Sequence, residues 1–325
     1  AKTKRWNHKN GADTMNQDAR IYVAGHLGMV GSACLRRLKL AGHRNLLLRS
    51  RAELDLRNKE AVHDFFAAER PDYVILAAAK VGGILANSEQ QAEFLLENLE
   101  IQNNVIMAAH KQGVKKFCFL GSSCVYPRLS PQPIREEYLL SGALEPTNEA
   151  YALAKISGLK LVSYLHKQYG FPGFSLMPCN LYGTNDNYHP EHSHVFAAFI
   201  RRFCLAVRDA AEHITLWGSG SPLREFMHVD DLAEAVYYFI QLDNLPQLPL
   251  NVGAGKEISI KQLAELIAVE TGFTGKINWD PSKPDGMPRK LMDSGRANAL
   301  GWSAKISLQE GIRRSIEEFR ELNKL

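Results

Sequence analysis

The sequence lacks the features that mark membrane proteins, disulfide-rich secreted proteins and zinc ribbons. Its longest notable apolar stretch, from Tyr73 to Ala79, is far shorter than the roughly 20 residues that span a bilayer. The N-terminus carries no apolar segment typical of a secretion signal. The five cysteines are an odd number and form no C-x-x-C pair. We therefore expect a cytoplasmic protein that has no membrane partner and in which any special cysteine serves chemistry.

A strong net charge is also missing. The chain carries +4, and its first 14 residues account for +3 of this charge. Because these residues are polar, aperiodic and followed by Met15, we expect them to be an appended tag and exclude them from the fold. The remaining +1 gives no reason to expect binding to nucleic acid or to membranes.

Short apolar β patterns alternate with helical patterns through the first half of the chain, which predicts an α/β fold with a parallel sheet. We expect strands at 20–24, 46–48, 73–77, 117–120 and 174–177, with helices to about 41, at 60–68, at about 90–110 and from 149. The second half interleaves loops rich in Pro, Gly and His with helices near 195–207, 232–242, 260–271 and 308–322. We expect a Rossmann-type doubly wound parallel sheet over 15–180 and a smaller substrate-binding domain over 181–325, with some segments of the latter returning to the sheet.

A glycine loop follows the first predicted strand and opens the first helix. Its spacing is G-x-x-G-x-x-G, and such glycines permit a tight turn and a close approach of the backbone to a pyrophosphate. A glycine triplet is weak evidence alone, but the strand before it and the helix after it favour a dinucleotide site. The expected cofactor contacts in this loop are Gly25, His26, Leu27, Gly28, Met29, Val30 and Gly31.

The end of the second strand indicates which dinucleotide is bound. An NAD enzyme would place an acidic residue there for the ribose 2′-hydroxyl, whereas this chain has Arg49 and Arg51. Two guanidinium groups suit a 2′-phosphate, so NADP is the expected cofactor. The alternative is that both arginines are solvated surface charge.

A tyrosine and a lysine four residues apart lie on one predicted helical face. The Lys155 ammonium there would lower the pKa of Tyr151 and orient the nicotinamide ribose. The phenol could then protonate the oxygen of a carbonyl that receives hydride. Ser122 follows the fourth strand, at the edge where open α/β sheets bind ligands, and could donate a hydrogen bond to the same carbonyl.

With these motifs the sequence resembles the extended short-chain dehydrogenase/reductases. Within them it resembles the 3,5-epimerase/4-reductases that convert GDP-4-keto-6-deoxy-D-mannose to GDP-L-fucose. The resemblance runs from about Arg20 to the C-terminus and rests on segments such as AGHLGMVGS, FLGSSCVYP, YALAK, WGSGSPLREFMHVDD and SKPDGMPRKLMD. The family commonly has Arg where this chain has Leu27, which removes one expected contact to the 2′-phosphate.

The resemblance implies a role for individual residues. Reduction would use Ser122, Tyr151 and Lys155, and the two epimerisations would use Cys124 and His194. Further cofactor contacts are implied for Asp55, Leu120, Gly121, Ser122, Ser123, Lys155, Pro178, Cys179, Asn180, Leu181 and His194. The GDP-linked 4-keto sugar would be bound by Arg202, Trp217, Arg224, Asp285 and Lys290. A homodimer through the helices at 90–110 and 149–169 is also implied.

Simpler interpretations remain for several of these residues. A cysteine after a strand is usually a small buried hydrophobe. His189, His192 and His194 could suggest a metal cluster, but no carboxylate or cysteine completes a ligand set, so no metal is expected. The alternatives for function are the same chemistry on another GDP-4-keto sugar (colitose or heptose pathway), reduction only, or a catalytically silent cofactor-binding regulator. The five intact chemical residues argue against silence.

Overall fold

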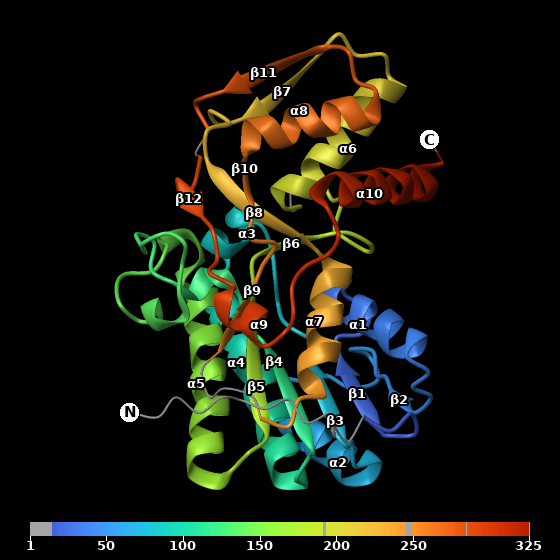
Figure 1. Ribbon diagram of the computed structural model, residues 1–325, viewed down its shortest axis with the longest axis vertical. Helices are drawn as coiled ribbons and strands as arrows, with labels where there is room; N and C mark the ends of the chain where they lie inside the picture. Colours follow the sequence, from blue (N-terminus) through green and yellow to red (C-terminus); the bar gives the residue numbers. More distant parts are fainter. Residues whose placement is uncertain (1–14, 191–192, 245–248, 284, 325) are drawn as a thin grey trace.

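The computed structural model describes residues 15–190, 193–244, 249–283 and 285–324. Residues 1–14, the expected tag, lie outside the described residues. Figure 1 shows two parts, a parallel sheet with helices on its faces and a smaller assembly of strands and helices above the carboxyl end of that sheet. None of the helices in the described ranges is long and apolar enough to cross a membrane.

The central sheet has six parallel strands in the order β2-β1-β3-β4-β5-β9. The strands are β1 (Ile21–Ala24), β2 (Leu46–Leu47), β3 (Tyr73–Leu76), β4 (Lys116–Leu120), β5 (Gly173–Pro178) and β9 (Leu250–Val252). Their order reverses between β1 and β3, so the carboxyl ends of these strands form the crevice in which doubly wound folds bind ligands. The predicted α/β Rossmann-type fold is confirmed.

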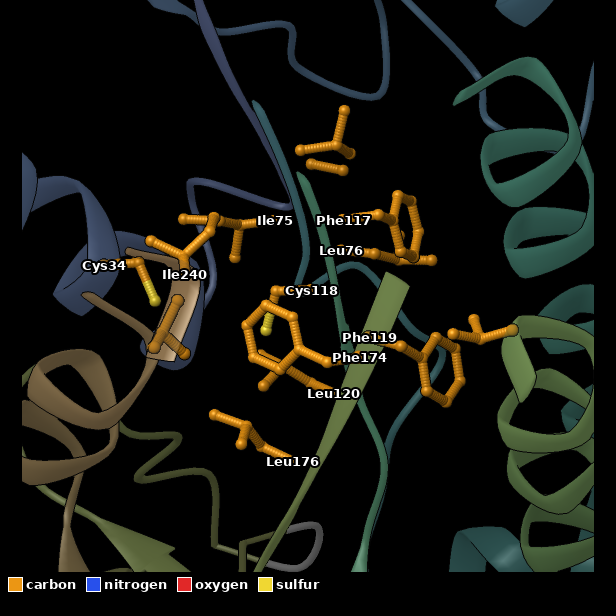
Figure 2. Packing of buried hydrophobic residues seen from close by; sticks show 14 of the residues in the cluster. Cys34, Ile75, Leu76, Phe117, Cys118, Phe119, Leu120, Phe174, Leu176 and Ile240 are labelled. Atoms are coloured by element: carbon orange, nitrogen blue, oxygen red, sulfur yellow. The ribbon is translucent and has the colours of Figure 1, made fainter. Parts of the chain in front are cut away.

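Helices cover both faces of this sheet because alternate residues of its strands are apolar on each side. Figure 2 shows Phe117 and Phe119 of β4 directed toward one helical layer and Cys118 between them directed toward Cys34 and Ile240 on the other. The first layer contains α2 (Lys59–Glu69), α4 (Gln91–Gln112) and α5 (Glu149–Tyr169), which pack on one another. The second contains α1 (Met29–Leu40) and α7 (Val229–Ile240).

The smaller part has its own strands and its own hydrophobic core. Strand β8 (Leu223–His228) pairs with β6 (Asn180–Tyr182), β10 (Glu257–Ser259) and β12 (Arg289–Lys290), while β7 (His213–Trp217) pairs with β11 (Lys276–Asp280). Helices α6 (Val195–Arg208), α8 (Ile260–Thr271) and α10 (Leu308–Asn323) bury their apolar faces together around Phe203 and Ile267.

The chain passes between the two parts several times. Strand β8 runs directly into α7, whose first turn is capped by the His228 side chain, and β9 then adds to the edge of the central sheet. The short helix α9 (Gly295–Ala299) also lies against β9. These crossings place β8 and β12 above the carboxyl ends of β4 and β5, which is where the expected chemistry lies.

Most helices agree with the expected ranges, and the differences have local causes. The helix expected from about 90 follows a break at Gln90, because α3 (Ile84–Glu89) ends there before α4 begins. The helix expected from 232 begins at Val229 because His228 supplies its cap. The short strands of the smaller part, and the 3-10 helices η1 (Ser123–Val125), η2 (Glu136–Tyr138) and η3 (Pro146–Asn148), carry no clear sequence period.

Candidate active site

The glycine loop brings the start of α1 very close to β1. Gly25 has φ +83°, and a methyl group there would lie 2.7 Å from the backbone of Ala78. A methyl group at Gly31 would lie 2.1 Å from the carbonyl oxygen of Gly25. The glycines at these two positions are therefore required by the close packing of loop, helix and the segment after β3.

The N-terminus of α1 has the properties of an anion site. Gly28 occupies the N-cap position without a side-chain cap, and no acidic residue stands in the first turn. The first N–H groups of a helix lack intrahelical partners and carry a partial positive charge, which suits a phosphate. The predicted residues Met29 and Val30 form the first turn, and the buried His26 Nδ1 has no hydrogen-bond partner within the described chain. These features fit a bound pyrophosphate.

The two arginines after β2 have different surroundings. Arg49 donates to Glu69 at 2.5 Å, and its guanidinium lies 5.4 Å from the centre of the Phe65 ring. Arg51 is 70% exposed and lies 3.7 Å from Glu97. Arg51 is thus better placed than Arg49 to change partners and meet a phosphate.

Asp55, the third expected contact in this region, is engaged within the protein. Arg57 donates to both carboxylate oxygens of Asp55, and this hydrogen bonding lowers the pKa of Asp55 to about 2. Arg57 also lies 3.4 Å from Glu97. The Asp55 carboxylate therefore stays ionised and paired at neutral pH.

Tyr151 and Lys155 share one face of α5, as the spacing predicts. Lys155 is 5% exposed; its ammonium donates to the carbonyl oxygen of Leu120 at 2.9 Å and lies 5.8 Å from the centre of the Tyr151 ring. Phe119 lies 5.0 Å from the same ammonium. Burial lowers the pKa of Lys155 to about 8, so the group is still mainly charged at neutral pH.

The expectation that Lys155 lowers the pKa of Tyr151 is wrong for this structure. Burial raises the pKa of Tyr151 above its usual value, and Cys124 adds to the rise. Desolvation is the largest cause of the rise, because the phenol lies among protein atoms, and the Phe94 ring is 6.5 Å from the Tyr151 ring. The phenol is therefore fully protonated at neutral pH, which is the state that a proton donor needs.

Ser122 and Cys124 lie side by side at the end of β4. Ser122 caps the short helix η1, and its hydroxyl accepts a hydrogen bond from the Cys124 N–H at 3.4 Å. Burial raises the pKa of the Cys124 thiol, while the Lys290 ammonium is the largest of the influences that oppose the rise. The thiol is thus protonated in the resting protein, with two lysines, Lys155 and Lys290, in its electrostatic surroundings.

His194 approaches from the other part of the molecule, at the N-cap position of α6. His194 as a residue is exposed to solvent, but protein atoms surround its ring. This desolvation lowers the pKa of the imidazole, which is therefore neutral at neutral pH. Within the described chain it makes no hydrogen bond to Ser122, Cys124, Tyr151 or Lys155. The structure brings those four residues together and leaves His194 on a separate element.

The remaining expected cofactor residues lie at the same edge of the sheet. Leu120, Gly121 and Ser123 end β4 and begin the following turn, and Pro178, Cys179, Asn180 and Leu181 span the passage from β5 to β6. Cys179 is buried; its thiol donates toward its neighbour's carbonyl, so its side chain faces the interior. Asn180 donates to the carbonyl oxygen of Glu225 and thereby ties β6 to β8.

Of the five residues expected to bind substrate, four form two pairs, and the fifth, Asp285, is bound to Ser219. The Arg202 guanidinium lies 5.8 Å from the centre of the exposed Trp217 ring. Arg224 and Lys290 are register neighbours on β8 and β12. Burial lowers the pKa of Lys290, and the Arg224 charge adds to this effect. Asp285 accepts hydrogen bonds from the N–H and hydroxyl of Ser219, both at 2.7 Å.

Lys290 connects the two parts of the site. It lies on β12, opposite Arg224, while its charge acts on the Cys124 thiol at the end of β4. A substrate that contacts Arg224 and Lys290 would therefore lie near Cys124. This arrangement suits an anionic group bound by the smaller part, with the reacting group held at the sheet edge.

Two residues of the site were not expected from sequence. Lys283 lies 5.5 Å from the centre of the Trp217 ring, so two cations contact that ring. Glu225 is completely buried and accepts backbone N–H groups from Gly255 and Met292, which fixes the ends of β10 and β12 beside β8. Both residues lie in segments that carry the family resemblance, WGSGSPLREFMHVDD for Glu225 and SKPDGMPRKLMD for Lys283, but their residue types alone predicted no role.

The histidines considered as a metal cluster can be placed only in part, because His192 lies outside the described residues. Over the rest of the described chain, no three His, Cys, Asp or Glu side chains are grouped so that they could hold a metal ion.

Comparison with known proteins places these features in a family. Residues 21–253 match the NAD dependent epimerase/dehydratase family. The chain is 53% identical over 314 residues to a putative GDP-L-fucose synthase 2 of Arabidopsis thaliana, covering 96% of this chain and 95% of that protein. It is 50% identical over 310 residues to the GDP-L-fucose synthase of Escherichia coli, covering 93% and 97%.

A solved structure agrees with these relatives. A GDP-mannoheptose C4 reductase from Campylobacter jejuni with NADP bound matches with a TM-score of 0.87 and 37% identity, over 94% of this chain and 99% of that one. The resemblance drawn from the sequence motifs is confirmed. The chain belongs to the NAD dependent epimerase/dehydratase family.

Proposed function

We propose that this protein is an NADPH-dependent enzyme that epimerises GDP-4-keto-6-deoxy-D-mannose at C3 and C5 and reduces it at C4, giving GDP-L-fucose. One observation carries the proposal: a protonated phenol, a buried ammonium, a hydroxyl and a protonated thiol converge at the carboxyl end of β4, beside the glycine loop. The identities of 53% and 50% to GDP-L-fucose synthases support the substrate, against 37% to the heptose reductase.

The chain's own residues would hold the cofactor at both ends. The first turn of α1 binds the pyrophosphate, Arg51 and Arg49 meet the 2′-phosphate, and Lys155 orients the nicotinamide ribose. When bound, NADPH supplies the hydride for C4. Leu27 is 67% exposed and offers no charge to the phosphate, so Arg51 carries more of that contact.

Epimerisation follows from the chemistry of a ketone at C4. The carbonyl acidifies the protons at C3 and C5, because each carbanion is stabilised as an enolate. In the resting protonation states the His194 imidazole can accept a proton and the Cys124 thiol can donate one. Ser122 and Tyr151 donate hydrogen bonds to the enolate oxygen and stabilise its charge.

Reduction uses the same carbonyl-binding groups. The Tyr151 phenol is protonated at neutral pH, and burial raises its pKa further, so it can deliver a proton to the C4 oxygen as hydride arrives. The Lys155 ammonium beneath the ring stabilises the phenolate that this transfer leaves. One oxygen site therefore serves both halves of the reaction.

The smaller part would hold the GDP portion. Arg224 and Lys290 provide adjacent charges for the diphosphate, and the Trp217 indole provides an apolar plane for a ring. Asp285 acts through Ser219, since both its carboxylate oxygens are engaged there. We expect it to shape the loop next to Trp217.

A homodimer and a cytoplasmic location complete the proposal. Two exposed apolar residues of α4, Leu96 and Met107, and two of α5, Leu153 and Tyr164, are spaced eleven residues apart along helices that pack on each other; Tyr169 at the end of α5 is exposed as well. That spacing returns to one side of a helix after three turns, which suits a four-helix interface between two copies. All five cysteines are free thiols, which suits a reducing compartment.

The substrate assignment is tested by product stereochemistry. Incubation with NADPH and a panel of GDP-linked 4-keto sugars, read by NMR, should give GDP-L-fucose from the 6-deoxy-mannose derivative at the highest rate. Tyr151→Phe keeps the ring but removes the proton, so reduction should fall roughly 10²–10⁴-fold while NADPH still binds. Near-normal turnover by this variant would show that another group is the acid.

The preference for NADPH over NADH is tested by replacing arginines near β2 and measuring kcat/KM with each cofactor. The unmodified enzyme should use NADPH with a higher kcat/KM than NADH, and Arg51→Ala should lower kcat/KM for NADPH by roughly 10-fold or more, since a charged hydrogen bond is lost. Arg44→Ala, which removes an exposed arginine at the opposite end of β2, is the matched control and should change neither value. Equal use of both cofactors by the unmodified enzyme would refute the assignment.

The two halves of the mechanism are separated by Cys124→Ala. A methyl group cannot carry a proton, so uptake of solvent deuterium at C3 and C5 should be lost, while the hydride site stays assembled and slow reduction of the unepimerised ketone can continue. Mass spectrometry and NMR of the recovered sugar measure both outcomes. Deuterium uptake at the unmodified rate, together with lowered thermal stability, would mean that Cys124 serves only in packing.

The proposed dimer is tested by sedimentation. The unmodified protein should sediment at twice the chain mass, and Leu153→Lys combined with Tyr164→Lys should give the monomer because two charges per chain enter the interface. Leu40→Lys, on the exposed end of α1, should leave the dimer intact. A monomeric unmodified protein at micromolar concentration contradicts the proposal.

A further inference from the structure

A polar loop of the smaller part reaches across to the glycine loop of the larger part. It spans residues 183–189, between β6 and the segment that leads to α6, and we name it the strap. Its residue Asn185 donates from Nδ2 to the carbonyl oxygen of Leu27 at 2.8 Å, and the same nitrogen lies 3.4 Å from the Ser32 hydroxyl. The strap thus contacts both the glycine loop and the first turn of α1.

With this contact, both polar atoms of the peptide group between Leu27 and Gly28 have a hydrogen-bond partner. The carbonyl of Leu27 accepts from Asn185, and the N–H on the other side of that peptide, that of Gly28, donates to the Gly25 carbonyl at 3.0 Å. Both polar atoms of the 27–28 peptide are therefore engaged, at the residue that forms the N-cap of α1. The direction of this peptide determines how the following N–H groups face a phosphate.

The strap is itself held from a third element. Glu318 of α10 accepts the backbone N–H of Asn185 at 2.7 Å and the hydroxyl of Tyr188 at 3.2 Å. Asn185 has φ +70°, a left-handed conformation that Asn adopts more readily than most residues. The side chain of Asn185 is thus directed to Leu27 by its own backbone and by the C-terminal helix.

Ser32 extends the connection into the second helical layer. Its hydroxyl accepts from Arg36 at 3.3 Å, and Arg36 donates to Asp230 of α7 at 2.7 Å. The strap, α1 and α7 are therefore joined at the N-terminal end of α1. Both neighbours of the strap along the chain, residues 178–181 and His194, are residues expected to meet the cofactor.

We propose that Asn185 is a positioning residue for the dinucleotide: it holds the 27–28 peptide in the orientation that binds the pyrophosphate, and Glu318 holds Asn185. The inference rests on the proposed function, in which the glycine loop binds NADPH. It gives the smaller part a role in cofactor affinity as well as in sugar binding. It also accounts for an amide at Asn185, since a carboxylate there would face the Leu27 carbonyl oxygen.

The test measures NADPH affinity without turnover, by titrating the full-length protein and following cofactor fluorescence. Asn185→Asp suits the left-handed backbone but replaces the donor with a negative charge, so the Kd for NADPH should rise about 10-fold or more. Asn185→Gly keeps the backbone and removes the side chain, and its Kd should rise roughly 3- to 10-fold. Asn187→Asp makes the same change two residues along the strap and should leave the Kd unchanged.

A second pair of variants examines the support from α10. Glu318→Ala should weaken NADPH binding several-fold, whereas Glu318→Gln retains an oxygen that accepts the Asn185 N–H and should bind nearly as the unmodified protein does. The Kd for GDP, bound by the smaller part, should change by less than about twofold in every variant. A rise in both Kd values together would indicate general loosening and overturn the proposal.

The remaining outcomes distinguish this proposal from the function on which it rests. If the unmodified protein does not bind NADPH, the proposed function fails and this inference fails with it. If the unmodified protein binds NADPH and Asn185→Asp binds equally well, the inference alone is wrong. Unchanged thermal unfolding of the cofactor-free variants, with a raised Kd for NADPH, supports the positioning role.

Discussion

The arrangement of the site depends on one buried charge, the Lys155 ammonium. The ammonium donates a hydrogen bond to the Leu120 carbonyl oxygen. This bond fixes α5 against the end of β4, where Tyr151 lies near Ser122 and Cys124. Because burial penalises the charged form, its pKa falls to about 8, and the group is still mainly cationic at neutral pH. Burial also raises the pKa of the phenol and of the thiol, so both groups, which are protonated at neutral pH without any shift, stay protonated.

A second constraint is the close packing at the glycine loop. A side chain at Gly25 or Gly31 would collide with backbone, and only their absence lets α1 begin where β1 ends. The helix N-terminus then faces the crevice between β1 and β3, which determines where a dinucleotide can lie. Strand β4 follows β3 in the same sheet, so the proposed carbonyl site at its carboxyl end lies close to the proposed dinucleotide site.

Residues of the smaller part lie beside the groups at the carboxyl end of the central sheet. The Lys290 charge opposes the rise in the pKa of the Cys124 thiol. Glu225 accepts backbone N–H groups that hold β12, which carries Lys290, beside β8, which carries Arg224. Asn185 extends the same principle to the glycine loop. Each part therefore supplies residues that lie beside the candidate site of the other.

The sequence by itself determined five of the six strands of the central sheet, most of the long helices, the glycine loop and the Tyr151–Lys155 face, because each rests on a short-range period or on a turn that only glycine permits. It did not reveal β9, which joins the sheet edge from far along the chain. It could not determine the pKa of Tyr151, since desolvation depends on atoms that α4 and β4 bring from elsewhere in the chain. Nor could it reveal that Arg49 is paired with Glu69 while Arg51 is exposed, or that Asn185 meets Leu27. These contacts join residues about 20 to 160 positions apart, so only the tertiary structure decided them.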